Sequence, residues 1–160
     1  MTKPRKYTGN TDPHPKARPG TVRFQEMMVF LFGMRSLGIY ANRPVRGGKG
    51  LSVHATGRAC DLGGTPKQVA EAIKFLHDFR YDLGIEAIHD YKNLVNPGRF
   101  GAAYRCNRDA WKVYDKPTLG DGGNWVHYEI TPLLADSPAK VDAAFKKVLD
   151  QIAVALAGLK

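Results

Sequence analysis

The sequence predicts an α+β domain in which a small antiparallel sheet packs on helices. Three segments carry apolar residues at helical spacing, and three short apolar segments between them have the length and composition of strands. Their order, helix–strand–helix–strand–loop–strand–helix, lacks the regular alternation that a parallel sheet with crossover helices requires. With 160 residues, 43% of them hydrophobic, the chain is long enough to form one domain with its own hydrophobic core.

The first predicted helix covers residues 21–37. Phe24 and Met28 lie on one helical face, and Gly38 follows the segment as a C-terminal stop. A loop rich in glycine and proline comes next, and residues 51–53 are expected to begin a short strand.

The second predicted helix begins after Thr65, which is a good N-cap residue, with Pro66 at its first position. Gly84 is expected to close this helical region. Residues 85–91, "IEAIHDY", have the composition of a strand.

The C-terminal third contains one more strand and one more helix. Residues 93–123 are expected to form a long irregular stretch, and residues 124–130, "NWVHYEI", a strand. The final helix begins at Ser137 and Pro138. Its apolar face comprises Val141, Phe145, Val148, Ile152 and Leu156.

Residues 1–20 are expected to form a basic extended arm, and residues 21–160 a single domain. The arm has five basic residues against one acid and contains four prolines, so it either serves as a solvated tail or makes contacts. The whole chain has a net charge of +9, which favours anionic partners such as nucleic acid, acidic lipid or cell-wall polymers. No recognised nucleic-acid-binding motif is present, so nucleic acid is not the expected partner.

The expected setting is that of a protein made in a cytoplasm. No apolar run is long enough to span a bilayer, so no membrane insertion is expected. The basic N-terminus lacks the apolar core of a secretory signal peptide. Cys60 and Cys106 are expected to be buried free thiols, because two cysteines do not make a disulfide framework.

Three residues carry the candidate chemistry: His54, Asp61 and His127. Small residues separate His54 from Asp61, and Gly57 permits the positive φ that would let the chain turn back between them. Two imidazoles and one carboxylate suit Zn²⁺ and leave a fourth position open. From spacing alone, each residue also has an ordinary interpretation, namely a hydrogen-bonded loop histidine, a turn aspartate and a core histidine.

The stretch "SVHATGRACDLGG" together with "WVHYEI" resembles the zinc D-Ala-D-Ala carboxypeptidase and L-alanyl-D-glutamate peptidase family, which includes bacteriophage lysins. That family carries S-x-H-x-x-G-x-A-x-D, and the fixed positions are matched here by Ser52, His54, Gly57, Ala59 and Asp61. The likeness covers roughly residues 21–131. It implies the Hedgehog/DD-peptidase fold, a zinc ion held by His54, Asp61 and His127, and peptidoglycan stem peptides as substrate.

The second motif departs from the family pattern. Three residues before its histidine the family has an acid as catalytic base, whereas this chain has Asn124. An amide does not accept a proton at neutral pH. Glu129, on the same strand face as His127, could replace the base or only orient a ligand, and Asp121 is a weaker substitute. The chain is therefore either a zinc peptidase or an impaired, zinc-containing protein that binds cell wall or builds a virion.

Stem peptides carry carboxylates, which arginine binds through paired hydrogen bonds. Arg43 and Arg58 are the candidate substrate-binding cations, with a solvated loop position as the alternative, and Ser52 could bind substrate or a ligand. His89 is a possible fourth residue of the metal region, although the family does not use that place for a ligand. A substrate outside the membrane and a chain without a signal peptide indicate a phage protein. We expect either a tail-associated wall-penetration enzyme among other tail proteins or an endolysin released through a holin.

Overall fold

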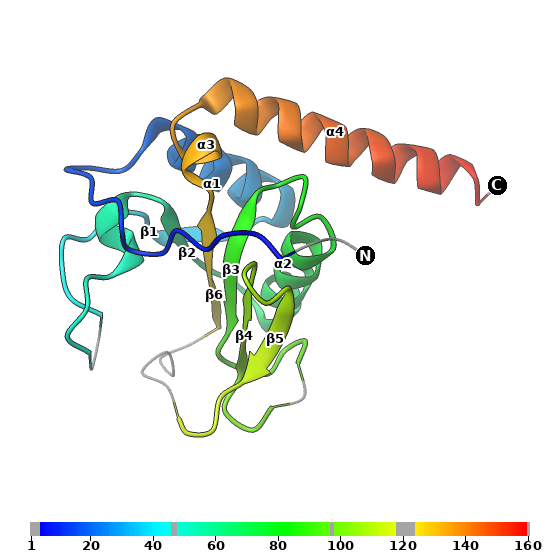
Figure 1. Ribbon diagram of the computed structural model, residues 1–160. Coiled ribbons are helices and arrows are strands. Elements are labelled where there is room, and N and C mark those ends of the chain that lie inside the picture. Colours follow the sequence, from blue (N-terminus) through cyan, green and yellow to red (C-terminus); the bar gives the residue numbers. More distant parts are fainter. Residues whose placement is uncertain (1–3, 46–47, 97, 118–123, 160) are drawn as a thin grey trace.

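The chain forms one antiparallel sheet with helices packed on one of its faces (Figure 1). The computed structural model describes residues 4–45, 48–96, 98–117 and 124–159. Within these ranges the strands are β1 (Arg35–Gly38), β2 (Ala59–Gly63), β3 (Ile85–Asp90), β4 (Ala102–Arg105), β5 (Ala110–Val113) and β6 (Trp125–Ile130). They lie in the order β1-β2-β6-β3-β4-β5, and every neighbouring pair is antiparallel. The predicted α+β class, with an antiparallel sheet on helices, is confirmed.

The helices form the second layer. They are α1 (Pro19–Phe32), α2 (Pro66–Asp78), the short α3 (Pro132–Ala135) and α4 (Pro138–Ala157), with a 3-10 turn η1 (Val53–Thr56) before β2. Helices α1 and α2 contact the sheet, and α4 packs on α1 (Figure 1). Within the described ranges, no helix combines the length and apolar character needed to cross a bilayer.

Two predicted helix starts are confirmed by their caps. Thr65 and Gln68 form a reciprocal capping box. The backbone N–H of Gln68 donates to Thr65 Oγ1 at 3.3 Å, and the backbone N–H of Thr65 donates to Gln68 Oε1 at 2.8 Å. At α4 the Lys140 amide donates to Ser137 Oγ at 3.3 Å. These bonds satisfy amides that have no partner inside their helices.

The first helix is shorter than predicted. It ends at Phe32, because Gly33 adopts a left-handed conformation with φ of 60°. Residues 35–37, which were expected to complete the helix, instead belong to edge strand β1 beside β2. The predicted stop at Gly38 is therefore wrong, and the helix stops at the earlier glycine.

The stretch 93–123, expected to be irregular, contains the hairpin of β4 and β5. Asp109 makes the tight turn possible, with φ of 44°, and its carboxylate accepts hydrogen bonds from Tyr81, Tyr104 and Arg80. Aspartate tolerates this conformation better than most residues. Each strand is only four residues long, which is too short for a clear alternation in the sequence.

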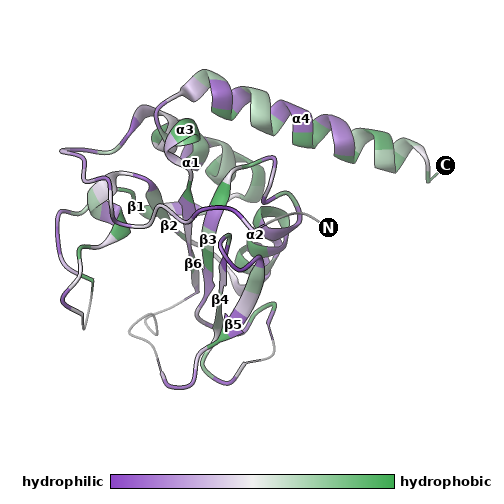
Figure 2. Cartoon of the chain, viewed as in Figure 1, coloured by the Kyte–Doolittle hydropathy of each residue, from purple (hydrophilic) through white to green (hydrophobic). Residues whose placement is uncertain are grey.

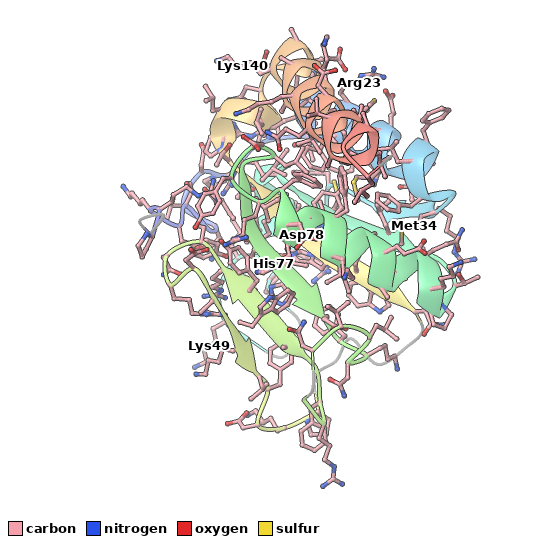
Figure 3. The ribbon with its side chains drawn as sticks, turned by 90° about the vertical axis from the view of Figure 1, so that its right-hand side faces the viewer. Arg23, Met34, Lys49, His77, Asp78 and Lys140 are labelled. Carbon is pink, nitrogen blue, oxygen red and sulfur yellow. The ribbon has the colours of Figure 1, made fainter. Side chains whose placement is uncertain are left out.

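Helix α4 is covered by the rest of the molecule over only part of its length. Val141, Phe145 and Val148 are fully buried, whereas Leu156 at the other end of the predicted stripe is 59% exposed. Apolar and polar residues alternate along the helix (Figure 2), and its C-terminal end extends beyond the body of the domain (Figure 1). At the surface, Arg23 of α1 (Figure 3) pairs with Asp142 of α4 at 2.6 Å.

The N-terminal arm is extended, as predicted, but it packs against the protein. It crosses the face of the sheet opposite the helices (Figure 1). Tyr7 donates to Glu129 of β6 at 2.7 Å, and Thr8 Oγ1 donates to Glu86 of β3 at 2.8 Å. The arm is thus part of the folded domain. Both cysteines are buried and free, as expected.

Candidate metal centre

The face of the sheet under the arm carries the candidate chemistry in one row. Asp61 of β2 lies directly opposite His127 of β6, and His127 lies directly opposite His89 of β3. Successive residues of a strand point to opposite faces. Cys60, next to Asp61, and Tyr128, next to His127, therefore point into the core, where both are buried. Antiparallel pairing thereby brings three sequence-distant polar residues together on one surface.

His54 reaches this row from the 3-10 turn η1, where a short strand was expected. Residues 51–53 are therefore not a strand; Leu51 makes one isolated bridge to Pro44, and η1 begins at Val53. Ser52 caps the turn, and its hydroxyl accepts from the His54 amide at 3.3 Å.

Gly57 ends η1 with φ of 68°, as the sequence predicted. A Cβ atom at this position would lie 2.5 Å from the carbonyl oxygen of Lys16 in the arm. The glycine is therefore required both by its backbone conformation and by the close approach of the arm. This turn is what brings His54 back over Asp61.

The three predicted ligands converge. His54 Nε2 lies 3.2 Å from Asp61 Oδ2, and His127 Nδ1 lies 2.8 Å from Asp61 Oδ1. Their candidate ligand atoms all lie within 4.8 Å of one another. The other ring nitrogen of His54, Nδ1, lies 2.8 Å from the carbonyl oxygen of Ile39, which can only accept, so Nδ1 carries a proton and Nε2 is the nitrogen directed at Asp61. The group fits a divalent metal ion bound by two nitrogens and one oxygen.

The electrostatics of the centre are those of a buried ion pair. Burial alone would raise the pKa of Asp61, but hydrogen bonds from His127 and His54 hold it well below its usual range. Burial alone would lower the pKa of His127, but its bonds to Asp61 and Glu129 raise it to about 9. In the metal-free protein the Asp61 carboxylate therefore faces an imidazolium, and a metal ion would replace the proton on Nδ1.

Glu129 lies behind His127. Its Oε1 is 3.2 Å from His127 Nε2, its Oε2 accepts the Tyr7 hydroxyl, and the residue is 3% exposed. Burial alone would raise the pKa of Glu129, but the hydrogen bond and charge of His127 outweigh burial and lower this pKa to about 2. Since both oxygens are engaged, Glu129 is arranged to fix the ring orientation and tautomer of His127.

His89, predicted only as a possible fourth residue of the metal region, forms a second candidate group with His127 and Glu129. Its Nδ1 lies 2.5 Å from the Tyr114 hydroxyl oxygen, and burial together with the charge of His127 lowers its pKa to about 3. This group shares His127 with the first, and its carboxylate is already bonded to Tyr7. Of the two groups, that of His54, Asp61 and His127 is therefore the better candidate for a metal site.

A cleft of about 940 Å³ opens above the centre. One wall is aromatic: the rings of Tyr91 and Tyr114 are stacked 6.1 Å apart, and those of Tyr91 and Trp125 lie 4.6 Å apart. Arg43 and Ser52, both predicted to meet substrate, line the cleft, although Ser52 is mostly buried as the cap of η1.

Arg58 does not lie in the cleft, so its predicted role in substrate binding is wrong. Its side chain is fully buried and pairs with Glu86 at 3.1 Å. It also donates to the carbonyl groups of Gly9 and Ile130. A buried arginine needs such partners, and here they tie the arm to the sheet.

Asn124, which occupies the place where a catalytic acid was expected, is exposed. Asn124 precedes β6, and its carbonyl accepts from the Gly64 amide at 3.2 Å. It is not among the described residues that line the cleft. Asp121, the weaker substitute for the base, lies outside the described residues. Of the two described candidates, Glu129 is the one at the centre.

Comparison with known proteins identifies no relative. No family model, no curated protein and no solved structure matches the chain. What can be said of its function therefore depends on the residues and on their geometry.

Proposed function

We propose that this chain is a zinc-dependent peptidase that cleaves bonds of peptidoglycan stem peptides. The observation that carries the proposal is the convergence of His54, Asp61 and His127 at the floor of a cleft. The first two belong to a ten-residue motif pattern that resembles one family of zinc peptidases. The Hedgehog/DD-peptidase fold and a phage setting, as tail-associated enzyme or endolysin, are parts of the same proposal.

In this proposal His54 Nε2, Asp61 and His127 Nδ1 hold the zinc ion. Bound zinc supplies a Lewis acid that polarises the carbonyl of the bond to be cleaved. The chain keeps these ligands in place through the Ile39 carbonyl behind His54 and through Glu129 behind His127. The aromatic wall and Arg43 then bind and orient the peptide in the cleft.

A second candidate is a zinc-containing protein that binds cell wall, or builds a virion, without cleaving. Asn124 favours it, because an amide at the place of the family acid does not accept a proton. The engagement of both Glu129 oxygens favours it as well. Loss of a positioned general base lowers the rate by about 10²–10⁴ without abolishing the reaction. Slow cleavage would therefore distinguish the two candidates less clearly than a complete absence of cleavage.

The test is digestion of purified peptidoglycan with one equivalent of zinc, with the products identified by mass spectrometry. Native chain, His54→Ala and Asn124→Asp are compared. The proposal predicts new peptide ends from the native chain and none from His54→Ala, and the product masses name the bond. Cleavage by Asn124→Asp alone would establish the non-cleaving candidate instead, and no cleavage by any of the three would contradict the peptidase proposal.

A further inference from the structure

Arg105 occupies the row of the sheet next to the metal centre. It lies opposite Ala87 of β3, and Ala87 lies opposite Glu129 of β6. Arg105 and Glu129 therefore point to the same face, two strands apart, which is a separation of about 10 Å. Arg105 lines the cleft together with the aromatic wall.

Arg105 differs from Arg58 and Arg80 in its partners, because each of those two arginines pairs with a carboxylate of the fold. Arg58 pairs with Glu86 at 3.1 Å, and Arg80 pairs with Asp109 at 3.0 Å. Among the described residues, no carboxylate lies within 4.0 Å of the Arg105 guanidinium.

The side chain of Arg105 contacts the arm. Its guanidinium carbon lies 4.8 Å from the centre of the Tyr7 ring. A guanidinium stacked on a ring keeps its N–H groups free at the edge, and that edge matches a carboxylate through two parallel hydrogen bonds. Tyr7 also bonds Glu129, so the arm fixes the position of Arg105 relative to the centre.

We propose that Arg105 binds a carboxylate of the peptide ligand in this cleft. The inference deepens the proposed function and rests on it for the nature of the ligand. Arg105 lies two strands from His127 and three strands from Asp61, which is a separation of about 10–15 Å from the centre. An extended peptide advances about 3.3 Å per residue, so the recognised carboxylate lies within about three to five residues of the cleaved bond. The ligand is thus an acidic peptide, and Arg105 sets its position and specificity.

The experiment measures the binding of paired synthetic stem peptides to the zinc-loaded full chain by calorimetry. In each pair one carboxylate is free in the first peptide and amidated in the second. For the carboxylate that Arg105 recognises, native chain is expected to bind the free acid about 10- to 100-fold more tightly than the amide. Arg105→Gln is expected to reduce this ratio to about twofold or less, with unchanged zinc content and unchanged affinity for the amide.

Two further variants keep the test specific. Arg105→Lys retains the charge but not the paired geometry and is expected to keep part of the preference. Lys112→Gln removes one positive charge from an exposed residue of the neighbouring strand β5 and is expected to keep all of it. A full preference in Arg105→Gln, or no preference in native chain, would overturn the inference. A preference without cleavage would retain it and contradict the peptidase proposal alone.

Discussion

Glu129 determines how His127 faces the centre. Its two oxygens take bonds from His127 and Tyr7, so neither is free to take a proton from a reacting group. The sequence left two roles open for this residue, catalytic base and orienting group, and its contacts favour the second. Whether the chain cleaves its substrate then depends on Asn124, the amide at the place where a catalytic acid was expected.

Glu129→Gln is predicted to weaken zinc binding about 10- to 100-fold, because the amide does not hold the His127 ring as firmly as the carboxylate. Competition with a fluorescent chelator measures the affinity. The matched control is Glu71→Gln on the exposed surface of α2, which should bind zinc like the native chain. Equal affinities for both variants would show that Glu129 does not support the ligand.

Asp109→Asn is predicted to lower the free energy of unfolding at pH 7 by about 1–3 kcal/mol, because the buried Tyr104 hydroxyl and Arg80 lose their charged partner. Urea unfolding measures it. Asparagine tolerates the positive φ of this turn, so the change tests the charge. Asp150→Asn, at an exposed position of α4, is the control and should change stability little.

The same carboxylate should make stability depend on pH. Hydrogen bonds from Tyr81 and Arg80 hold the pKa of Asp109 well below its usual range. A group whose pKa is lowered by folding stabilises the protein above its unfolded pKa of about 3.9, and that stabilisation is lost as the pH falls. The unfolding free energy of Asp109→Asn should therefore fall less between pH 5 and pH 2 than that of the native chain; equal slopes would contradict this account.

At the scale of elements, the turn η1 and the arm depend on each other. Gly57 ends the turn that carries His54, and the arm backbone passes directly against it. Arg58, the next residue, binds the arm carbonyl of Gly9. Gly57 and Arg58, which lie between His54 and Asp61 in the sequence, therefore support the candidate site by holding the arm beside it.

Gly57→Ala is predicted to destabilise the fold by about 1–2 kcal/mol from the left-handed backbone alone, and by more from the contact with Lys16. Thermal unfolding and zinc affinity should both fall. Gly48→Ala is the control, because the nearest atom to its added Cβ would be 3.6 Å away and its φ is ordinary. Similar stability of the two variants would show that the arm does not need Gly57.

The sequence predicts the elements that have local signals. Thr65 and Ser137 carry caps followed by proline, and the helices that start there were placed correctly. Met34 and Leu37 continue the apolar spacing of α1 past Gly33, which made the helix appear longer than it is. The β4–β5 hairpin depends on Asp109, which has no glycine beside it to indicate a turn.

The residues of the candidate site also fall into those that have a local signal in the sequence and those that have none. His54 and Asp61 were identified because a motif fixes their spacing, and Glu129 because it alternates with His127 on one strand. His89 was named only as a possible residue near the metal, since its place beside His127 depends on strand register. Tyr7 could not be found, since its contact depends on where the arm packs. A basic arm without secondary structure gives no signal in the sequence for such a contact.

At the scale of the whole molecule, α4 shows where the domain ends as a packed body. Its first half covers the core beside α1, and its last turns extend past the other elements (Figure 1). Val154 is 74% exposed and Leu159 is 82% exposed. The predicted apolar stripe is thus continuous in sequence but buried only in part.

Removal of residues 153–160 is predicted to leave the melting temperature nearly unchanged, because the deleted side chains bury little apolar surface. Differential scanning calorimetry measures it. Removal of residues 145–160 is the contrasting variant, since it also deletes buried Phe145 and Val148 and should prevent stable folding. Equal effects of the two truncations would contradict this description of the core.

The proposed metal centre is tested first by the zinc stoichiometry of the metal-free chain, titrated at neutral pH and measured by calorimetry and elemental analysis. A metal centre of His54, Asp61 and His127 would bind one zinc tightly per chain, and the zinc would be lost in His54→Ala and kept in His14→Ala, whose half-buried histidine lies in the arm outside the candidate ligand groups. If the native chain binds no zinc, or if His54→Ala binds it equally well, then His54, Asp61 and His127 do not form a metal centre.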